Sequence, residues 1–417
     1  MRDEGFVIPY GDGVISISVR GAVLKKPRYV GSVGVEDELN IIDSSLESPI
    51  NTPYLSELVS SSSRVALLVS DITRPCPSSK IVPIILKKLL SYGVKKDNIL
   101  IVFATGIHRP HTMDEWVKLL GVDVVRSFKV LDHNAFDKNN LTYVGRTSRG
   151  TPVEVNSLVF NSDLMIGVAN VDPHYFAGYS GGGKSVLPGV SSYVSIRENH
   201  KMMLLPGAEL ARLDGNPVRE DIEEAASLVG LEYIVNVVLS ESKEVLGCFS
   251  GHFIKAHREA VKFFNEIYGV EIGRRYDVVV TSPGGFPKDI NLYQAHKALE
   301  VAFKCVRPGG VIILLAECRE GVGDKKTEEL LYSGLTPEEV VSFVRENFDL
   351  GYHKAYAIAR IATKSNILIV SKNIKDSKLY KRFNNFEEAL KYAYELIGSG
   401  DSLILPYASS MIPKDLI

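Results

Sequence analysis

The chain alternates short, almost wholly apolar runs with longer segments whose apolar residues recur at helical spacing. The short runs have the character of strands buried on both faces of a parallel sheet, and they cover residues 65–69, 99–103, 277–280, 311–315 and 367–370. The longer segments would form helices that cover such sheets, and they cover residues 79–92, 217–229, 251–267 and 292–306. This alternation predicts an α/β fold with mostly parallel sheets.

The first 45 residues follow a different pattern. Residues 14–19 alternate between apolar and polar in the manner of a half-buried strand, and Gly11-Asp12-Gly13 offers a turn just before them. Such a pattern predicts an antiparallel hairpin, which we expect at the edge of a sheet.

At 417 residues the chain exceeds the size at which a single core usually keeps growing, so two domains are expected. The best boundary lies near residues 269–275, where a long amphipathic segment ends and charged residues precede a new strand at Tyr276. We therefore predict two α/β domains, residues 1–272 and 273–417, with an active-site cleft between them, because small ligands often bind between domains.

Composition narrows the class of partner. Lys and Arg total 48 against 50 for Asp and Glu, which gives no electrostatic reason to expect nucleic acid or an anionic membrane. The charged start, and the lack of any apolar run near the roughly 18 residues needed to span a bilayer, predict neither a signal peptide nor a membrane helix. We expect a cytoplasmic protein that acts on small molecules.

Cysteine usage supports the same location. The residues Cys76, Cys248, Cys305 and Cys318 are scattered without a Cys-x-x-Cys pair. This spacing suggests neither a disulfide framework nor a thiolate metal site. We expect these thiols to be reduced and to have packing roles.

The segment from His174 to Gly189 concentrates glycines around one lysine. Residues 178–185 match the letters Gly-x-x-x-x-Gly-Lys-Ser/Thr of a phosphate-binding loop. In such loops a strand comes directly before and a long helix directly after. Here the apolar run ends ten residues before Gly178, and Pro188-Gly189 leave little room for a helix. The context therefore argues against a phosphate-binding loop.

Candidate catalytic side chains follow the predicted strands. Asp71 comes just after the strand at 65–69, at the strand edge where open α/β sheets bind ligands. On residues alone, Asp71 could instead cap a helix or form a turn, and Arg74 could form a surface ion pair.

Histidines occur in two separate loops. His108 follows the strand at 99–103 in a Gly-containing turn, and His111 lies three residues on. These two could be a weak metal pair or plain loop residues. Imidazole is nevertheless the natural general acid or base near neutral pH, and His174 lies in another loop. Two bases from separate loops can flank one substrate. His133, His252, His257 and His353 have no motif around them and are predicted to be structural.

In the second predicted domain, Gln294 and Lys297 lie at i and i+3 of a predicted helix and therefore share a face. Tyr293 and His296 frame them. Taken alone, this segment reads equally well as an ordinary amphipathic helix.

Several blocks occur in a fixed order between residues 64 and 300: Ser70-Asp71-Ile72-Thr73-Arg74-Pro75, Thr105-Gly106-Ile107-His108-Arg109-Pro110-His111-Thr112, His174 with Lys184, Glu198-Asn199-His200, Pro283-Gly284-Gly285 and Tyr293-Gln294-Ala295-His296-Lys297. In this order they resemble the nickel-dependent lactate racemase family. Members of that family carry a nickel-pincer nucleotide, Ni(II)-pyridinium-3,5-bisthiocarboxylate mononucleotide, bound covalently to a lysine.

The resemblance implies a role for each block. Lys184 would form the covalent link to the cofactor and His200 would be the protein ligand to nickel, since imidazole suits Ni(II) and the cofactor supplies a carbon and two sulfurs. His108 and His174 would be the catalytic bases. The remaining implied roles are cofactor contacts from Asp71, Ile72, Thr73 and Arg74, and substrate contacts from Arg74, Tyr293, Gln294 and Lys297. Residues 1–272 would thus be the cofactor-binding catalytic domain and residues 273–417 the substrate-contacting domain.

The implied activity is racemisation of a small 2-hydroxy acid, with lactate as the prototype, by hydride transfer through the cofactor. The C2 hydrogen of a 2-hydroxycarboxylate is a poor acid because its conjugate base would lie beside an ionised carboxylate. Transfer as hydride avoids that carbanion. The resemblance also implies other proteins as partners, because the cofactor must be synthesised elsewhere.

The sequence is also compatible with other functions. One is a nucleotide-dependent kinase or ATPase built on residues 178–185, with Asp71 holding magnesium. Another is a non-catalytic two-domain protein that binds small molecules, although the pair His108 and His174 argues against it. A dinucleotide dehydrogenase is disfavoured, because no Gly-x-Gly-x-x-Gly follows a predicted strand. The single tryptophan, Trp116, lies beside the His108 block rather than near Lys297, so the substrate's size is not fixed.

Overall fold

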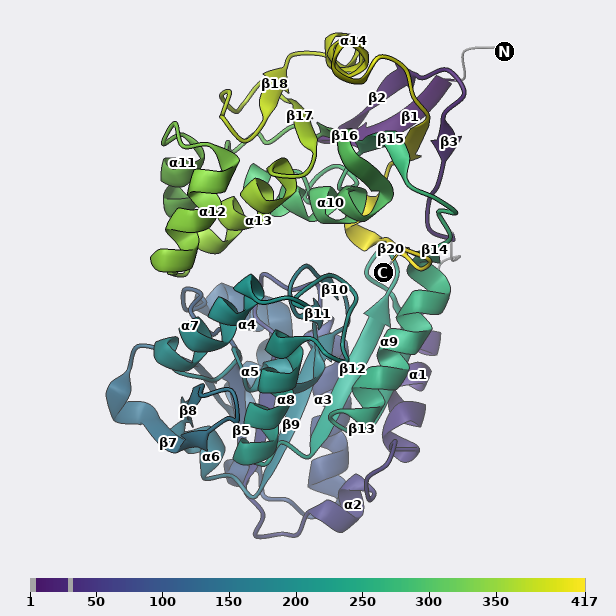
Figure 1. The fold of residues 1–417 in the computed structure, drawn as a ribbon. Coiled ribbons are helices and arrows are strands. Elements are labelled where there is room, and N and C mark those ends of the chain that lie inside the picture. Colours follow the sequence, from purple (N-terminus) through teal and green to yellow (C-terminus); the bar gives the residue numbers. More distant parts are fainter. Residues whose placement is uncertain (1–4, 29–32, 417) are drawn as a thin grey trace. The chain divides into compact units, whose positions relative to one another are not determined.

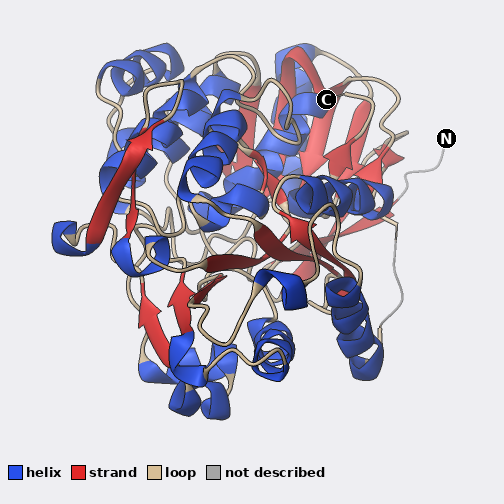
Figure 2. Cartoon of the chain, turned by 90° about the horizontal axis from the view of Figure 1, so that it is seen from below, coloured by secondary structure: helices blue, strands red, loops and turns tan. Residues whose placement is uncertain are grey.

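The structure, a computed structural model, describes residues 5–28 and 33–416. The chain forms two compact units. One is Tyr29–Glu266, called here the central unit, and the other combines Met1–Arg28 with Ile267–Ile417, called here the terminal unit. Each unit contains helices together with a largely parallel sheet (Figures 1 and 2), so the predicted α/β class is confirmed.

The central unit is built on a six-stranded sheet with the order β13-β12-β9-β4-β5-β6. Its strands are β4 (Val65–Val69), β5 (Ile99–Phe103), β6 (Lys129–Asp132), β9 (Leu164–Asn170), β12 (Tyr233–Leu239) and β13 (Val245–His252). Neighbours pair in parallel except β13, which runs antiparallel to β12. The chain moves outward from β4 to β6 and then returns to β9 on the other side of β4. This is a doubly wound order, and its switch point lies beside β4.

Alternate strand residues of this sheet build one core. Val65, Leu67 and Val69 of β4 are fully buried and pack with Ile85 and Leu89 of α3 (Ser78–Ser91). Burial of a leucine of this kind contributes roughly 2–3 kcal/mol. The same core takes residues from α1 (Val35–Glu47), α4 (Met113–Leu120) and α5 (Val122–Ser127). The carboxyl ends of β4 and its neighbours are thereby held rigidly.

Further elements of the central unit complete its surface. They are α2 (Leu55–Leu58), β7 (Leu141–Arg146), β8 (Pro152–Asn156), α6 (Ser157–Phe160), β10 (Pro173–His174), β11 (Gly178–Tyr179), α7 (Tyr193–Lys201), α8 (Pro217–Val229) and α9 (Lys255–Tyr268). Helix α8 matches its predicted range because the residues at its two ends define where it starts and stops. The Asn216 side chain accepts from the backbone N–H groups of Val218 and Arg219, and Gly230 ends the helix in the left-handed conformation.

The terminal unit contains a second six-stranded sheet, in which every pairing is parallel and the order is β18-β17-β16-β15-β19-β3. The strands are β15 (Tyr276–Thr281), β16 (Val306–Leu315), β17 (Asn366–Val370), β18 (Lys381–Phe383), β19 (Ser402–Leu405) and β3 (Val23–Leu24). Its helices are α10 (Leu292–Cys305), α11 (Lys325–Leu331), α12 (Pro337–Glu346), α13 (Tyr352–Ala362) and α14 (Phe386–Ile397). A short parallel pair joins β14 (Gly269–Val270) to β20 (Ile412–Pro413).

The first residues of the chain belong to the terminal unit, whereas the sequence analysis placed them in the domain 1–272. Two physical reasons explain this difference. Strand β3 pairs with β19 at the sheet edge, and the hairpin of β1 (Gly5–Tyr10) and β2 (Gly13–Ser18) inserts Ile8 and Ile17 into the core of the terminal unit. The predicted hairpin is present, but β3 rather than the hairpin forms the sheet edge.

Local patterns predicted most elements closely. All five predicted strands occur, and the helix predicted at 251–267 begins at Lys255 because residues 251 and 252 still pair with β12 as part of β13. Within the ranges 5–28 and 33–416, no helix combines the length and apolar character needed to span a bilayer.

Candidate active site

The switch point of the central sheet gathers the first candidate residues. The carboxyl end of β4 lies beside that of β9, where Val69 pairs with Val168, and beside that of β5, where Val69 pairs with Phe103. The loops that follow these three strands carry Asp71, His108 and His174. In doubly wound folds this edge is where small ligands bind.

Asp71 is the anchor of a tight turn at the end of β4. Its Oδ1 accepts from the backbone N–H of Thr73 at 2.7 Å and also from the Thr73 hydroxyl. Its Oδ2 lies 2.8 Å from Nδ1 of His108. Burial alone would raise the pKa of Asp71, but the hydrogen bond from His108 and the positive charges of His108 and Arg74, together with the Thr73 bond, lower it to about 2. Asp71 is therefore an ionised partner for His108.

His108 is oriented for proton transfer by this contact. Because the carboxylate of Asp71 can only accept, Nδ1 of His108 is the donor, and Nε2 is left as the nitrogen that can exchange a proton with a substrate. The side chain of His108 is 42% exposed, which suits a base that must meet a ligand. A carboxylate that orients an imidazole in this way is a recurrent catalytic arrangement.

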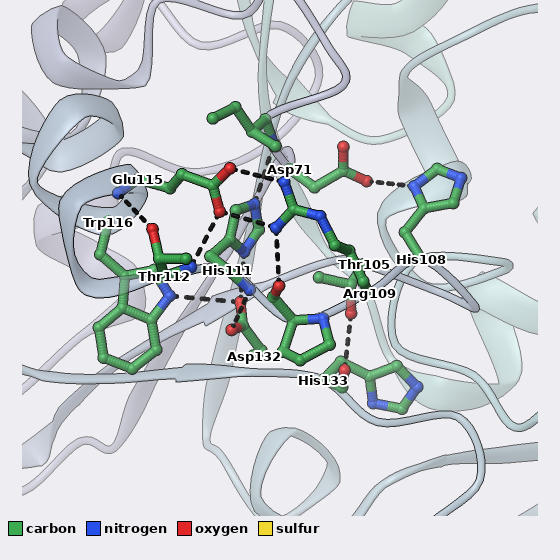
Figure 3. A network of polar contacts seen from close by, with 12 residues as sticks. Asp71, Thr105, His108, Arg109, His111, Thr112, Glu115, Trp116, Asp132 and His133 are labelled. Atoms are coloured by element: carbon green, nitrogen blue, oxygen red, sulfur yellow. Dashed lines mark hydrogen bonds and ion pairs between the residues drawn. The ribbon is translucent and has the colours of Figure 1, made fainter.

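His111, three residues on, occupies a different environment (Figure 3). Its side chain is fully buried, and both ring nitrogens are engaged by the protein, Nδ1 by Asp132 and Nε2 by the backbone N–H of Ile72. The possibility that His108 and His111 form a metal pair is therefore wrong, because no lone pair of His111 faces a common ligand position with His108.

The glycine-rich segment does not form a phosphate-binding loop. Residues 182–185 form one turn of 3-10 helix, and the next α-helix, α7, begins only at Tyr193. The backbone N–H of Gly182 donates to the Asn236 side chain at 2.8 Å and so is not directed at a phosphate. The kinase or ATPase reading, which requires a strand, a loop and a long helix in succession, does not fit this geometry.

Buried polar side chains hold this segment in place. Arg219 of α8 is fully buried and donates to the carbonyl groups of Ala177, Tyr179 and Gly181. His257 of α9, predicted to be structural, contacts the carbonyl of Ser180 at 2.8 Å through Nε2. Burial of these groups is tolerated because each finds hydrogen-bond partners. The lysine that follows is consequently on a rigid support.

Phe176 is the centre of a cluster that joins three candidate residues. The ring of Phe176 lies 4.5 Å from the His174 ring and 5.1 Å from the His200 ring, measured between centroids, and in both pairs the rings meet edge to face. Nζ of Lys184 lies 6.0 Å from the same centroid. The structure thus brings His174, Lys184 and His200 together around one buried aromatic ring, which the sequence analysis did not identify.

Lys184 has an electrostatic environment that favours its neutral amine. Burial, and then the positive charges of Arg219 and Arg74, hold the pKa of Lys184 well below its usual range. Because the charge of Arg74 contributes to this shift, the turn after β4 lies near the glycine-rich segment. A neutral amine is the form that attacks an acyl group, so this lysine is suited to covalent attachment.

Two contacts tie the remaining blocks to this site. The backbone N–H of Gly106 donates to the carbonyl of Gly189 at 2.9 Å, which packs the His108 loop against the glycine-rich segment. Asn199, next to His200 on α7, is fully buried and donates to the carboxylate of Asp221 at 2.8 Å. Nδ1 of His174 accepts from the backbone N–H of Ala177 at 3.2 Å, so the neutral ring carries its proton on Nε2.

The candidate substrate residues of the terminal unit lie on α10. Nζ of Lys297 donates to Oε1 of Gln294 at 2.9 Å, so the two share a face as predicted. His296 instead points into the interior, where Nδ1 contacts the carbonyl of Tyr293 at 2.7 Å and Nε2 contacts Nζ of Lys354 at 3.3 Å. Lys354 also lies 4.6 Å from the centroid of the Tyr293 ring. Two lysines, Lys297 of α10 and Lys354 of α13, therefore contact side chains of α10.

In the described part of the chain, no group of three or more His, Cys, Asp or Glu side chains is placed to hold a metal ion. A metal bound at His200 would therefore need most of its ligands from another molecule.

The doubly wound central sheet, with an oriented imidazole at its switch point and a lysine whose pKa is lowered by burial, is typical of a small-molecule enzyme. Comparison with known proteins specifies it further. Residues 10–211 match the lactate racemase N-terminal domain, and residues 273–411 match the lactate racemase C-terminal domain. The chain belongs to the lactate racemase family, as the resemblance predicted.

Individual relatives match nine tenths of the chain or more. The lactate racemase of Thermoanaerobacterium thermosaccharolyticum is 31% identical, with 98% of this chain and 99% of the relative covered. The lactate racemase of Lactiplantibacillus plantarum is 32% identical, with 90% and 91% covered. The solved structure of the T. thermosaccharolyticum lactate racemase apoprotein superposes with a TM-score of 0.89 at 29% identity, covering 98% of this chain and 99% of that one. A Thermotoga maritima protein, at 18% identity and a TM-score of 0.62, shares the fold alone.

Proposed function

We propose that this protein racemises a small 2-hydroxy acid, with lactate as the prototype, and that it uses a nickel-pincer nucleotide attached to Lys184. The observation that carries this proposal is the cluster of His174, Lys184 and His200 around Phe176, beside the oriented pair of Asp71 and His108. Family membership supports the same activity.

The residues present fit the cofactor. Lys184 offers an amine whose pKa is lowered by burial and by Arg219 and Arg74, as covalent attachment requires. His200 offers one imidazole for nickel, and the remaining ligands would come from the cofactor itself. The turn of residues 71–74 would add polar contacts. When held by Lys184 and His200, the cofactor would supply an acceptor for the C2 hydrogen of the substrate as hydride.

The protein's own contribution is to move the hydroxyl proton and to hold the substrate. Nε2 of His108 is one candidate position, since Nδ1 of His108 donates to Asp71. The imidazole of His174, whose Nδ1 accepts from the Ala177 backbone, is the other candidate group. One imidazole would remove the hydroxyl proton from one enantiomer, and the other would serve the opposite enantiomer. A racemase needs both, because the planar 2-oxo acid must be rebuilt from either face.

Carboxylate binding is assigned to cationic side chains. Arg74 offers a planar, bidentate donor. Lys297, held by Gln294, offers a second positive charge, and Tyr293 on the same helix would also contact the substrate. These groups would neutralise the substrate carboxylate.

We further propose that the enzyme works in the cytoplasm and depends on other proteins for its cofactor. The free thiols Cys76, Cys305 and Cys318 are buried, and a reducing compartment would preserve them. The small 2-hydroxy acid and the cofactor-synthesising proteins are the partners that this function requires.

The proposal is tested with protein made in cells that produce the cofactor and in cells that do not. Protein from producing cells should carry one covalent adduct and nickel, and it should convert both D- and L-lactate, or another small 2-hydroxy acid, to the racemate. Protein from the other cells should do neither. A protein that carries the adduct yet interconverts no 2-hydroxy acid would favour the non-catalytic binding function instead.

A further inference from the structure

A second carboxylate–histidine pair lies next to the first and has no assigned role. Oδ1 of Asp132 is 2.5 Å from Nδ1 of His111, and Oδ2 of Asp132 accepts from the backbone N–H of His111 at 2.9 Å. The indole N–H of Trp116 also points to Oδ1, at 3.4 Å. Figure 3 shows this network beside Asp71 and His108. The imidazole of His111 is therefore held firmly from one side.

The other side of the His111 ring is directed at the turn after β4. Nε2 of His111 lies 3.0 Å from the backbone nitrogen of Ile72. The backbone N–H can only donate and the Asp132 carboxylate can only accept, so one arrangement of protons satisfies both contacts. His111 must be neutral, with its proton on Nδ1 and a lone pair on Nε2. Asp132 stabilises this tautomer.

The amide that His111 holds is the peptide group between Asp71 and Ile72. Fixing this peptide fixes the direction in which the Asp71 side chain leaves the backbone. Asp71 in turn orients His108 through the 2.8 Å contact. The parallel registers of β4, β5 and β6 make this possible, because Val69 pairs with Phe103 and Phe103 pairs with Asp132. The strand ends thus carry the turn, the loop of both histidines and Asp132 side by side.

We propose that His111 and Asp132 are positioning residues for the proposed racemase. By accepting a hydrogen bond from Ile72, His111 holds the segment 71–74 in the geometry that keeps Asp71 against His108. Because the His111 side chain is fully buried, the pair would act through the turn rather than by contact with a ligand. The expected effect of His111 and Asp132 on catalysis depends on the proposed racemase function. Their expected effect on the conformation of the turn at 71–74 does not depend on it.

The test compares two replacements of His111. Leucine has a similar volume and no acceptor, whereas glutamine places an amide oxygen at about the reach of Nε2. In unloaded protein, hydrogen exchange of the peptide that covers Ile72 should show one protected amide fewer in His111→Leu than in wild type. His111→Gln should retain that protection. Nitrogen-15 spectra of labelled histidine should also show the neutral form with the proton on Nδ1, through a signal that is lost in both variants.

In loaded protein the same variants should differ in turnover. Small displacements of catalytic groups cost up to about a hundredfold, so kcat of His111→Leu should fall roughly tenfold to a hundredfold with little change in KM, and His111→Gln should recover most of it. Asp132→Asn preserves the shape of the side chain but weakens the preference for the proton on Nδ1 of His111, so its kcat should lie between those of the two His111 variants. This variant replaces His111→Leu in the test if His111→Leu does not fold. Leu89→Ala, a cavity in the same core, controls for general loss of stability and should keep wild-type turnover.

Two results would overturn the proposal. One is unchanged protection of the Ile72 amide in His111→Leu, and the other is equal turnover of the leucine and glutamine variants. If the wild-type protein racemises no 2-hydroxy acid, the proposed function fails while the exchange experiment still decides whether His111 positions the turn.

Discussion

Oδ2 of Asp71 lies 2.8 Å from Nδ1 of His108, and this contact joins the ends of two neighbouring strands, β4 and β5. The carboxylate is buried and ionised, while the imidazole is partly exposed. A buried charge of this kind is stable only because its partners satisfy it. The same contact therefore affects stability, pH dependence and catalysis.

The pH dependence of stability should report Asp71. Its folded pKa, about 2, is lower than the usual 3.8, so the ionised form stabilises the native state. This contribution, roughly 2 kcal/mol, should be complete above about pH 5 and be lost as the pH falls from 4 towards 2. Urea unfolding of wild type and Asp71→Asn at several pH values measures it. The difference in free energy of unfolding between the two proteins should shrink in acid. A difference that does not depend on pH would contradict the lowered pKa of Asp71.

The two proposed bases should have opposite selectivity. His108→Ala and His174→Ala should each abolish interconversion in both directions, because each enantiomer needs both bases for inversion. Each variant should still oxidise one enantiomer to the 2-oxo acid in a single turnover, and the preferred enantiomer should differ between the two variants. Loss of a general base typically costs about a hundred- to ten-thousandfold. Near wild-type inversion by either variant would exclude the two-base mechanism.

Lys184 should be modified and, before modification, unusually reactive. Peptide mapping of active protein should place the cofactor mass on this residue. In unloaded protein, carbamylation by cyanate should reach half its maximal rate at a pH well below the usual lysine range, because burial and the cations Arg219 and Arg74 disfavour the ammonium. Lys391, 81% exposed, serves as an internal reference for consumption of the reagent. An unmodified Lys184 in fully active enzyme would rule out covalent attachment there.

Nickel retention should depend on His200. His200→Ala should lose most of the metal during purification, since one imidazole is the proposed protein ligand. Its fold should survive, because Asn199 and Asp221 anchor α7 independently of the His200 ring. Metal analysis and circular dichroism test both statements. His252→Ala, on β13, is the matched control and should keep its nickel; equal nickel in the His200 variant would assign the ligand elsewhere.

Substrate binding should depend on Lys297. Lys297→Ala should raise KM for 2-hydroxy acids by roughly tenfold to a hundredfold, as expected for one lost charge-assisted contact, without changing the amount of bound cofactor. Gln294→Ala should have a smaller effect in the same direction, since it orients the lysine at 2.9 Å. Lys325→Ala, at a side chain 90% exposed, controls for the loss of one positive charge. Unchanged KM for every acid tested would leave α10 with a structural role only.

Much of this arrangement follows from local sequence. Apolar runs predicted the parallel strands, and the rule that ligands bind at carboxyl strand ends singled out Asp71 and His108. Helical spacing predicted that Gln294 and Lys297 share a face, and their side chains do meet. These features depend on residues close in sequence, so a pattern can reveal them.

Other parts of the site depend on contacts between distant residues. Phe176 reads as one more aromatic in a mixed segment, and its role appears only when α7 brings His200 to its ring. Arg219 reads as a surface residue of an amphipathic helix, yet it is fully buried beneath the glycine-rich segment. His111 and His108 look equivalent in sequence, and only the strand register that delivers Asp132 separates them. No local pattern carries this information.

The pairing of β3 with β19 has a consequence for how the protein is made. The terminal unit combines residues from both ends of the chain. During synthesis, β3 therefore cannot pair with β19 until β19 has left the ribosome. The central unit is continuous and can fold while translation proceeds. A fragment that starts at residue 273 would lack an edge strand and the apolar hairpin residues, and we expect it to aggregate, whereas a fragment limited to residues 29–266 should be expressed in a folded state.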